Sequence, residues 1–215
     1  MSNKLTGNST ALREYKQTIT LSQIQMEILV GTLLGDACIS LDNCVQFEQC
    51  IARENYIWHL YEIFRDFVGT PPRVKKIRGG GAGDRQSLRF RTYRHPDFEF
   101  YYNLFYPAHP GCRRKKRVAE SISELLTARA LAYWFMDDGS ALSRKARRYY
   151  VFNTHSFPLE DQGAKGVVDA LRDNFDIDAT IKKPPLAPYY VLYIRSKSTE
   201  RFIDLIHPSR KRALF

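Results

Sequence analysis

Two stretches of the sequence place carboxylates at the end of an apolar segment. LAYWFMDDG, residues 131–139, passes from aromatic residues directly into Asp137 and Asp138, and LVGTLLGDA, residues 29–37, ends in a similar way at Asp36. A helix C-terminus already carries partial negative charge, so a carboxylate there costs a few tenths to about 1 kcal/mol. Stability alone disfavours this placement, which therefore needs a chemical reason. The chemistry that carboxylates offer includes ligation of divalent cations.

Both acidic stretches are predicted to be the ends of helices. The sequence Thr20-Leu-Ser-Gln23 predicts a capping box at the start of the first helix, which continues through apolar residues to Leu34. About 100 residues later, Thr127 can cap the second helix. Each helix would therefore deliver a carboxylate at its C-terminal end.

The elements predicted after each acidic stretch follow the same order, which indicates an internal duplication. Each half is expected to contain strands, an amphipathic helix, two basic strands around a turn and a short helix that runs into a proline. The order in each half is αββαββα. The first half is predicted to have strands at 38–40, 45–49, 73–78 and 88–94 with helices at 54–68 and 98–106, and the second to have strands at 149–153, 180–183 and 190–195 with helices at 159–175 and 200–207.

The composition excludes several classes of protein. The 215 residues are 44% hydrophobic, which is enough for a core without covalent staples. The four cysteines form no CxxC pair and the histidines lack zinc-site spacing, so we expect neither a disulfide scaffold nor a zinc site. No stretch has the features of a signal peptide or the length of a membrane span, so we expect a soluble intracellular protein. The net charge of +10 favours a polyanionic partner, most simply nucleic acid.

The two nonamers, each followed by the αββαββα order, resemble the LAGLIDADG homing endonucleases, in particular the monomeric branch with two motifs in one chain. The resemblance covers essentially residue 20 to the C-terminus. It implies an α+β fold of two pseudo-symmetric halves, in which the motif helices pack side by side and the antiparallel sheets form a DNA-binding saddle. The expected divisions are an N-terminal tail (1–19), a first half (20–112), a basic linker with a short helix (113–126) and a second half (127–215).

The resemblance also implies roles for the acidic residues. The eighth motif position is the family's metal-binding acid, which is Asp36 in one half and Asp138 in the other. These residues would hold Mg²⁺, and Mn²⁺ or Ca²⁺ could occupy the same sites. One metal site for each strand would give a double-strand break. Asp137 points about 100° away from Asp138 on a helix, so we favour no direct role for it.

The two halves depart from symmetry at other positions. The third motif residue is Gly31 in the first helix, which permits close packing, but Tyr133 in the second. The family's basic residue near the active site matches Lys116 in the first half, and plain phosphate binding is the alternative interpretation. Lys211 is the corresponding candidate in the second half.

A polar residue is expected to position water near each acid. In the first half this residue is predicted to be Gln49, on the strand after the motif, with Glu48 as the alternative. In the second half the matching stretch is NTHS, so Asn153 or His155 would have to serve. A solvated sheet face would explain the first pair nearly as well.

Basic residues lie near alternating positions of the predicted strands. Residues two apart share one sheet face, and such a face can bring cationic groups to phosphates and to base edges in the major groove. The alternative is a solvated sheet surface, but recurrence in both halves and the excess of positive charge favour contact with DNA. The predicted DNA-binding residues are Arg73, Lys75, Arg78, Arg89, Arg91, Lys182 and Arg195.

The leading functional hypothesis is a site-specific, Mg²⁺-dependent endonuclease that cuts double-stranded DNA as a monomer at a long asymmetric target. Family context suggests that it is encoded in an organellar or bacterial intron. One alternative is an RNA maturase on the same fold, which the basic surface fits equally. The other is a non-catalytic DNA-binding protein, which the acids at both eighth motif positions argue against.

Overall fold

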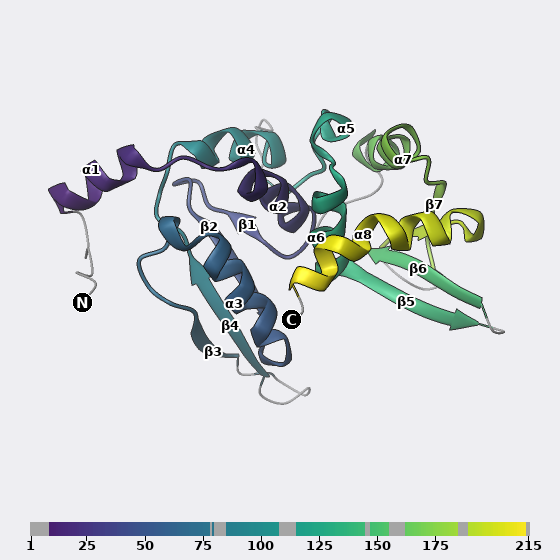
Figure 1. The fold of residues 1–215 in the computed structure, drawn as a ribbon, viewed down its shortest axis with the longest axis horizontal. Helices are drawn as coiled ribbons and strands as arrows, with labels where there is room; N and C mark the ends of the chain where they lie inside the picture. The colour runs from purple at the N-terminus through teal and green to yellow at the C-terminus, as the bar shows by residue number, and fades with distance from the viewer. Residues whose placement is uncertain are drawn as a thin grey trace. The chain divides into compact units, whose positions relative to one another are not determined.

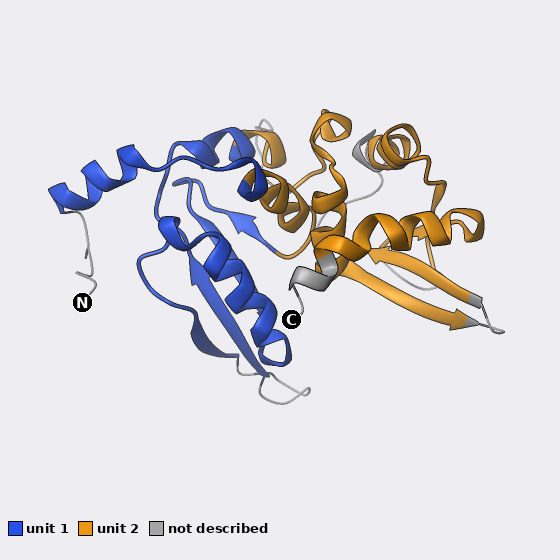
Figure 2. Cartoon of the chain, viewed as in Figure 1, with its two compact units in different colours: residues 1–25, 37–102, 213–215 blue, residues 26–36, 103–212 orange. Residues whose placement is uncertain are grey.

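The computed structural model describes residues 9–77, 79, 85–107, 115–144, 147–154, 162–184 and 189–213. The chain forms two compact units, shown in separate colours in Figure 2. Unit 1 comprises residues 1–25, 37–102 and 213–215, and unit 2 comprises residues 26–36 and 103–212. Most of the first motif helix therefore belongs to the same unit as the second motif helix.

Unit 1 is built on a four-stranded antiparallel sheet with the strand order β1-β2-β4-β3. Helix α3 lies over one face of this sheet (Figure 1), where the ring of Phe47 packs 5.0 Å from that of Phe64 and 4.8 Å from that of Phe90. The elements along this part of the chain are α1 (Thr10–Thr18), α2 (Gln23–Leu34), β1 (Cys38–Ile39), β2 (Val45–Cys50), η1 (Ile51–Arg53), α3 (Glu54–Ile63), η2 (Arg65–Phe67), β3 (Arg73–Ile77), β4 (Arg85–Arg91) and α4 (Asp97–Phe105).

Unit 2 has a second four-stranded antiparallel sheet with the corresponding order β5-β6-β8-β7. Its core contains the rings of Trp134 and Phe152, whose centroids are 4.1 Å apart, and Phe202 packs against Phe135 at 5.2 Å. The elements of this part are α5 (Ile122–Leu125), α6 (Ala128–Asp138), β5 (Gly139–Arg144), β6 (Arg147–Asn153), α7 (Gln162–Phe175), β7 (Ala179–Lys182), β8 (Val191–Ile194), η3 (Ser196–Ser198) and α8 (Thr199–Ala213).

The predicted fold class is confirmed, because each half runs αββαββα around its own antiparallel sheet. Strand β5 was not predicted from the sequence. It begins at Gly139, immediately after the last residue of α6, so no turn residue separates the two elements. Helix α8 was expected to end before Pro208 but continues to Ala213. The proline ring fixes a φ value compatible with a helix, and the helix continues despite the lost backbone hydrogen bond.

The predicted N-terminal cap is confirmed for only one of the two motif helices. Thr127 caps α6 as predicted, with its hydroxyl accepting the backbone N–H of Ala130 at 3.1 Å. The predicted capping box from Thr20 to Gln23 is wrong by two residues. Helix α2 begins at Gln23, so Ser22 is the capping residue, and it exchanges hydrogen bonds of 3.3 and 2.9 Å with Gln25.

The predicted N-terminal tail contains helix α1, which the sequence analysis did not anticipate. Ser9 caps this helix by accepting the backbone N–H of Leu12 at 3.2 Å. Tyr15 donates its hydroxyl to the carbonyl oxygen of Asp66 at 3.1 Å, and the carbonyl oxygen of Lys16 lies 2.8 Å from Nε2 of His95. These contacts attach α1 to the rest of unit 1. Among the described residues, no helix combines the length and hydropathy required to cross a lipid bilayer.

Candidate functional site at the ends of the motif helices

Helices α2 and α6 approach each other closely within unit 2. Ile24 and Met26 near the start of α2 are exposed, whereas the apolar side chains from Ile28 to Leu34 are buried, as expected for a helix that enters a protein interior. A β-carbon placed at Gly31 would lie 2.2 Å from the carbonyl oxygen of Ala130, so only glycine permits this approach. Tyr133, at the third position of the second motif, is only 3% exposed. The predicted asymmetry of the helix pair is confirmed.

The same helices meet again at the seventh position of each motif. A β-carbon at Gly35 would lie 2.4 Å from both Cβ and Oδ2 of Asp137. The carboxylate of Asp137 occupies this space and accepts the backbone N–H of Asp36 at 3.2 Å. Asp137 therefore contacts the main chain next to the first-motif acid, an interaction that its position beside Asp138 did not predict.

The two acids at the eighth motif positions lie where these helices end. Asp36 is exposed, whereas Asp138 is half-buried and its Oδ2 atom is shielded from solvent. Gly139 allows the chain to pass directly from α6 into β5, because a β-carbon there would lie 2.2 Å from the carbonyl oxygen of Phe135. The predicted acids are thus delivered by the ends of α2 and α6, beside the contact between Gly35 and Asp137.

Lys116 supplies a positive charge at the end of α2. Its ammonium group donates to the carbonyl oxygen of Gly35 at 2.5 Å, immediately before Asp36 in the chain. A cation at a helix C-terminus offsets the partial negative charge of the last carbonyl groups, which makes an acid there less costly. Lys211, the second predicted lysine, belongs to α8, but its side chain lies outside the described part of the structure.

Asn153 is the second-half polar candidate that the structure brings to its acid. Its side-chain amide donates to the carbonyl oxygen of Asp138 at 3.2 Å and to the hydroxyl of Ser140 at 3.1 Å. These bonds link the end of β6 to the junction between α6 and β5. His155, the other candidate, lies outside the described residues.

The structure does not support Gln49 as a residue that positions water. In β2 its side chain lies on the same face as Phe47, toward the core, and it is only 8% exposed. Its amide oxygen accepts a hydrogen bond from Arg53 at 3.2 Å. Glu48, the alternative, lies on the opposite face, where it accepts a hydrogen bond from Ser87 at 2.6 Å.

The sequence analysis overlooked Gln46, which lies on the same face as Glu48. Its side-chain amide donates to Glu48 at 3.3 Å, and its backbone pairs with Cys38 at the start of β1. The alternation of apolar and polar residues through β2 is the signal that would have found it, because residues two apart point to one side of a sheet. Gln46 and Glu48, rather than Gln49, therefore lie on the face of β2 where a polar side chain could position water.

The predicted DNA-binding residues of the first half share one sheet face. Arg73 pairs with Arg89, which in turn pairs with Glu48, and this places all three side chains opposite the face covered by α3. Lys75 and Arg91 follow at the alternate positions of β3 and β4, and Lys75 forms an ion pair with Glu48 at 3.3 Å. Arg78 lies outside the described residues.

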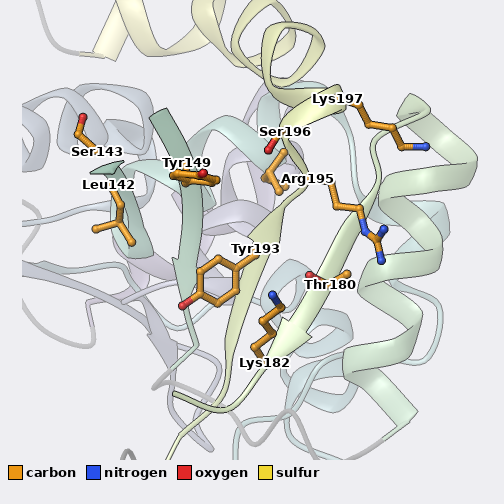
Figure 3. Close-up of a pocket in the computed structure, with 10 residues that line it drawn as sticks. Leu142, Ser143, Tyr149, Thr180, Lys182, Tyr193, Arg195, Ser196 and Lys197 are labelled. Carbon is orange, nitrogen blue, oxygen red and sulfur yellow. The ribbon is translucent and has the colours of Figure 1, made fainter. Parts of the chain in front are cut away.

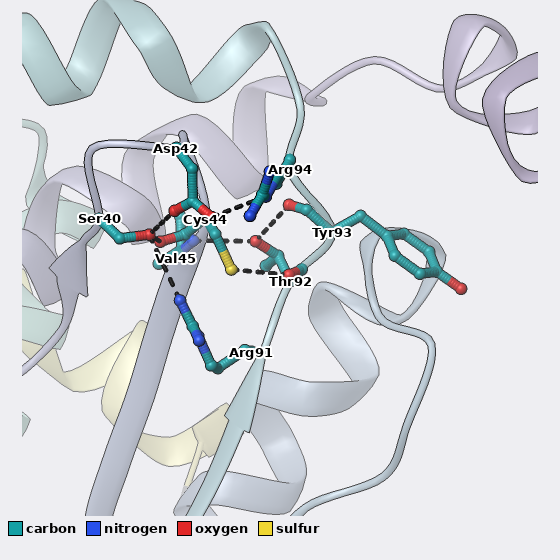
Figure 4. A network of polar contacts seen from close by, with 8 residues as sticks. All are labelled: Ser40, Asp42, Cys44, Val45, Arg91, Thr92, Tyr93 and Arg94. Atoms are coloured by element: carbon teal, nitrogen blue, oxygen red, sulfur yellow. Dashed lines mark hydrogen bonds and ion pairs between the residues drawn. The ribbon is translucent and has the colours of Figure 1, made fainter. Parts of the chain in front are cut away.

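The edge of this face is fixed by polar contacts around the turn between β1 and β2 (Figure 4). Arg94 pairs with Asp42 at 2.6 Å, and Arg91 donates to the hydroxyl of Ser40 at 3.4 Å. The hydrogen bond from Ser40, together with the charge of Arg94, lowers the pKa of Asp42. The carboxylate therefore remains ionised and holds the turn beside one of the predicted DNA-binding arginines.

In unit 2 the exposed face of the sheet forms a hollow of about 920 Å³ (Figure 3). Lys182 and Arg195, the two DNA-binding residues predicted for the second half, both line it. Lys182 lies over the ring of Tyr193 at 5.7 Å from the centroid. Lys197 pairs with Asp178, and this lysine lowers the pKa of that carboxyl group.

The arrangement of two motif helices, two sheets and two basic faces matches one protein family. The sequence model of the LAGLIDADG DNA endonuclease family covers residues 26–202. The chain belongs to the LAGLIDADG DNA endonuclease family. Membership accounts for the duplicated αββαββα order and for the acids at the ends of α2 and α6.

Two endonucleases and a maturase resemble this chain over most of its length. The probable intron-encoded endonuclease 1 of Wickerhamomyces canadensis is 30% identical over 210 residues, which cover 94% of this chain and 87% of the relative. The DNA endonuclease I-ChuI of Chlamydomonas applanata is 26% identical over 203 residues, 88% of this chain and 92% of the relative. The cytochrome b mRNA maturase bI2 of Saccharomyces cerevisiae is 26% identical over 193 residues, 85% of this chain but only 44% of the maturase.

Solved structures of homing endonucleases show the same fold. The homing endonuclease I-WcaI bound to its DNA recognition sequence matches with a TM-score of 0.83 and 28% identity, over 98% of this chain and 95% of that chain. A variant of I-DmoI, in complex with its target DNA and manganese, matches with a TM-score of 0.51 over 88% of this chain and 97% of that chain. The latter is 16% identical, so this likeness concerns the fold alone.

Proposed function

We propose that this protein is a homing endonuclease, which hydrolyses both strands of a specific duplex DNA and is encoded within an intron. The observation that carries the proposal is the joining of the two motif-helix ends, where Asp137 holds the backbone beside Asp36 and Lys116 binds the carbonyl oxygen of Gly35. Each acid at an eighth motif position is thereby delivered from a rigid helix. The probable intron-encoded endonuclease 1 and the DNA endonuclease I-ChuI among its relatives support the same activity.

We infer that Asp36 and Asp138 hold divalent cations and that Mg²⁺ is the physiological ion. Carboxylate oxygens suit Mg²⁺, which is commonly bound by one or two protein carboxylates with water and substrate phosphates completing its shell. At the ends of α2 and α6 the protein oxygens would come from Asp36 and Asp138, and water and DNA phosphates would supply the remaining ligands. A divalent cation supplies Lewis-acid stabilisation and lowers the pKa of a bound water.

The remaining residues of the site would orient the acids and the DNA. Asp137 fixes the main chain at Asp36, and Asn153 fixes the main chain at Asp138. The ammonium group of Lys116 can stabilise negative charge on a scissile phosphate near the end of α2. Each acid thus has its own supporting side chain, which accords with one cut in each strand.

The basic sheet faces would bind the duplex on either side of the cleavage positions. Arg73 and Arg89 lie at paired positions in unit 1, and Lys182 and Arg195 line one hollow in unit 2. Contacts of such cations with phosphates give most of the affinity, and contacts with base edges give the specificity.

Cleavage of an intron-less junction tests the proposal. The full-length protein is incubated with Mg²⁺ and a plasmid that carries the exon junction of the gene whose intron contains this reading frame. We expect linear plasmid from wild type and none from a variant carrying both Asp36→Asn and Asp138→Asn. Failure of wild type to cut this plasmid would contradict the proposal. In a parallel assay, faster splicing of the host intron RNA without DNA cleavage would assign the protein to the maturases instead.

A further inference from the structure

The exposed faces of the two sheets differ in chemistry. In unit 1, the face opposite α3 is dominated by polar and charged side chains. These are Gln46, Glu48, Arg73, Lys75, Arg85, Ser87, Arg89 and Arg91. In unit 2, the corresponding face carries apolar and aromatic side chains on three adjacent strands, with the cations Lys182 and Arg195 on the side of β7 and β8. The three side chains are Leu142 on the edge strand β5, Tyr149 on β6 and Tyr193 on β8.

Leu142, Tyr149 and Tyr193 do not belong to the core of unit 2. The opposite face of the same strands carries Tyr150, Phe152 and Leu192, which are all buried. Leu142 lies directly across from Tyr149 in the pairing of β5 with β6, yet it is 45% exposed. An exposed leucine on an edge strand contributes little to folding, so this position favours contact with a ligand.

The hollow offers both apolar contact and positive charge to one ligand (Figure 3). Tyr193 lies among the labelled side chains, with Lys182 and Thr180 on one side and Leu142 and Tyr149 on the other. The ammonium group of Lys182 is 5.7 Å from the Tyr193 ring centroid, which fixes a cation beside the apolar patch. A duplex DNA edge combines these features, because its phosphates are anionic and its major groove presents one apolar group, the thymine methyl.

We infer that this hollow reads thymine methyl groups in the half-site bound by unit 2, with Leu142 and Tyr193 as the contact residues. The inference rests on the proposed function. Lys182 and Arg195 at the rim would meet phosphates or guanine, whereas the first half-site would be read through the polar side chains of unit 1. The two halves of the target would therefore be recognised by different chemistry.

Stacking on single-stranded nucleic acid is the competing use of these rings. Such stacking needs a free aromatic face, and the ammonium group of Lys182 lies over the Tyr193 ring, so a base would have to displace this group or use the other face. The proposed function makes the duplex the favoured ligand. Tighter binding of single-stranded DNA or RNA than of the duplex would overturn the inference.

Replacement of thymine by deoxyuridine tests the inference, because it removes the methyl group and leaves the hydrogen-bonding edge unchanged. The probe is the intron-less junction duplex, with all thymines replaced first in one half-site and then in the other. We expect wild type to lose about fourfold in affinity for each methyl group that unit 2 buries, and less than about twofold in the other half-site. The inference would be overturned if deoxyuridine changed the affinity by less than about twofold in both half-sites.

Variants identify the responsible side chain. In Leu142→Ala the penalty for deoxyuridine should decrease, whereas in Leu41→Ala it should remain, because Leu41 is 78% exposed and lies outside the hollow. A full penalty in Leu142→Ala would contradict the role of Leu142. These outcomes are distinct from failure of the proposed function, in which wild type would not bind the unmodified junction specifically.

Discussion

Asp137 occupies the space that a side chain at Gly35 would need. The glycine directly follows the first motif helix and the aspartate lies in the last turn of the second, and a β-carbon on the glycine would lie 2.4 Å from the aspartate Cβ. The freed space lets the carboxylate reach the backbone N–H of Asp36 at 3.2 Å. The two motifs thus differ at their seventh position because one residue must make room for the other.

This relationship predicts that Gly35→Ala destabilises the protein. The contact is with Cβ of Asp137 rather than with the tip of a flexible side chain, so the helices must shift, at a cost of about 1–3 kcal/mol. Gly166→Ala in α7 is the matched control, since a β-carbon there would meet Ile122 at an ordinary 3.6 Å. Denaturant unfolding should show a loss for the first variant only. A Gly35→Ala, Asp137→Gly double variant should recover part of the loss, and strict additivity would contradict the proposed contact.

Asp137 is predicted to be a positioning residue. Asp137→Asn keeps an oxygen that can accept the N–H of Asp36, whereas Asp137→Ala removes it. We expect the asparagine variant to retain most cleavage and the alanine variant to accumulate nicked plasmid, because only the strand served by Asp36 is affected. Quantification of nicked and linear product over time makes the comparison. If the asparagine variant were as inactive as one lacking Asp36 or Asp138, Asp137 would have a direct catalytic role.

Asp36→Asn and Asp138→Asn should each abolish double-strand cleavage while specific binding remains largely intact. The substitutions remove proposed metal ligands and leave the basic sheet faces unchanged. Plasmid linearisation and a gel-shift titration, both with Mg²⁺ present, measure the two properties separately. Full cutting by either variant would refute the assignment. Nicking by only one of them would indicate partly independent sites for the two strands.

Much of this arrangement follows from the sequence because the chain repeats itself. The duplicated order of elements predicted the strands of both sheets except β5, and Gly31 with Tyr133 indicated an asymmetric helix pair. The face of β2 was harder to assign, because shifting a strand by one residue exchanges its two faces. Burial of Phe47 decides that Glu48 and Gln46, rather than Gln49, face outward.

The contact between Gly35 and Asp137 could not be predicted from either motif alone. It depends on the register in which α2 lies against α6, and that register is set by side chains distributed along both helices. The same holds for the hydrogen bond from Lys116 to Gly35, which joins residues 81 apart in the sequence. Pairings of this kind require the packed structure.

Binding to DNA should weaken steeply with salt, and Lys182→Ala should reduce the slope by about one if this lysine meets one phosphate. Lys75→Ala should have the same effect, with an added loss of affinity at low salt, because Glu48 would lose its ion-pair partner on the DNA-facing side. Arg172→Ala is the control, since this arginine is already engaged by Asp169 and Asp173 in α7. Titrations of the junction duplex at several salt concentrations give the slopes. An affinity for the duplex that did not change with salt concentration would contradict the interpretation that this protein binds nucleic acid.

One chain is predicted to bind one asymmetric duplex. A homodimer with one motif per subunit would need a near-palindromic target, whereas the two sheet faces of this chain carry different side chains and can read different half-sites. Unit 1 presents the more basic face, so its half-site should contribute more of the affinity. Sedimentation of the protein–DNA complex gives the stoichiometry, and two chains per duplex would contradict the monomer.

Scrambling each half-site in turn tests the asymmetry. An equal loss of affinity on scrambling either half-site would rule it out.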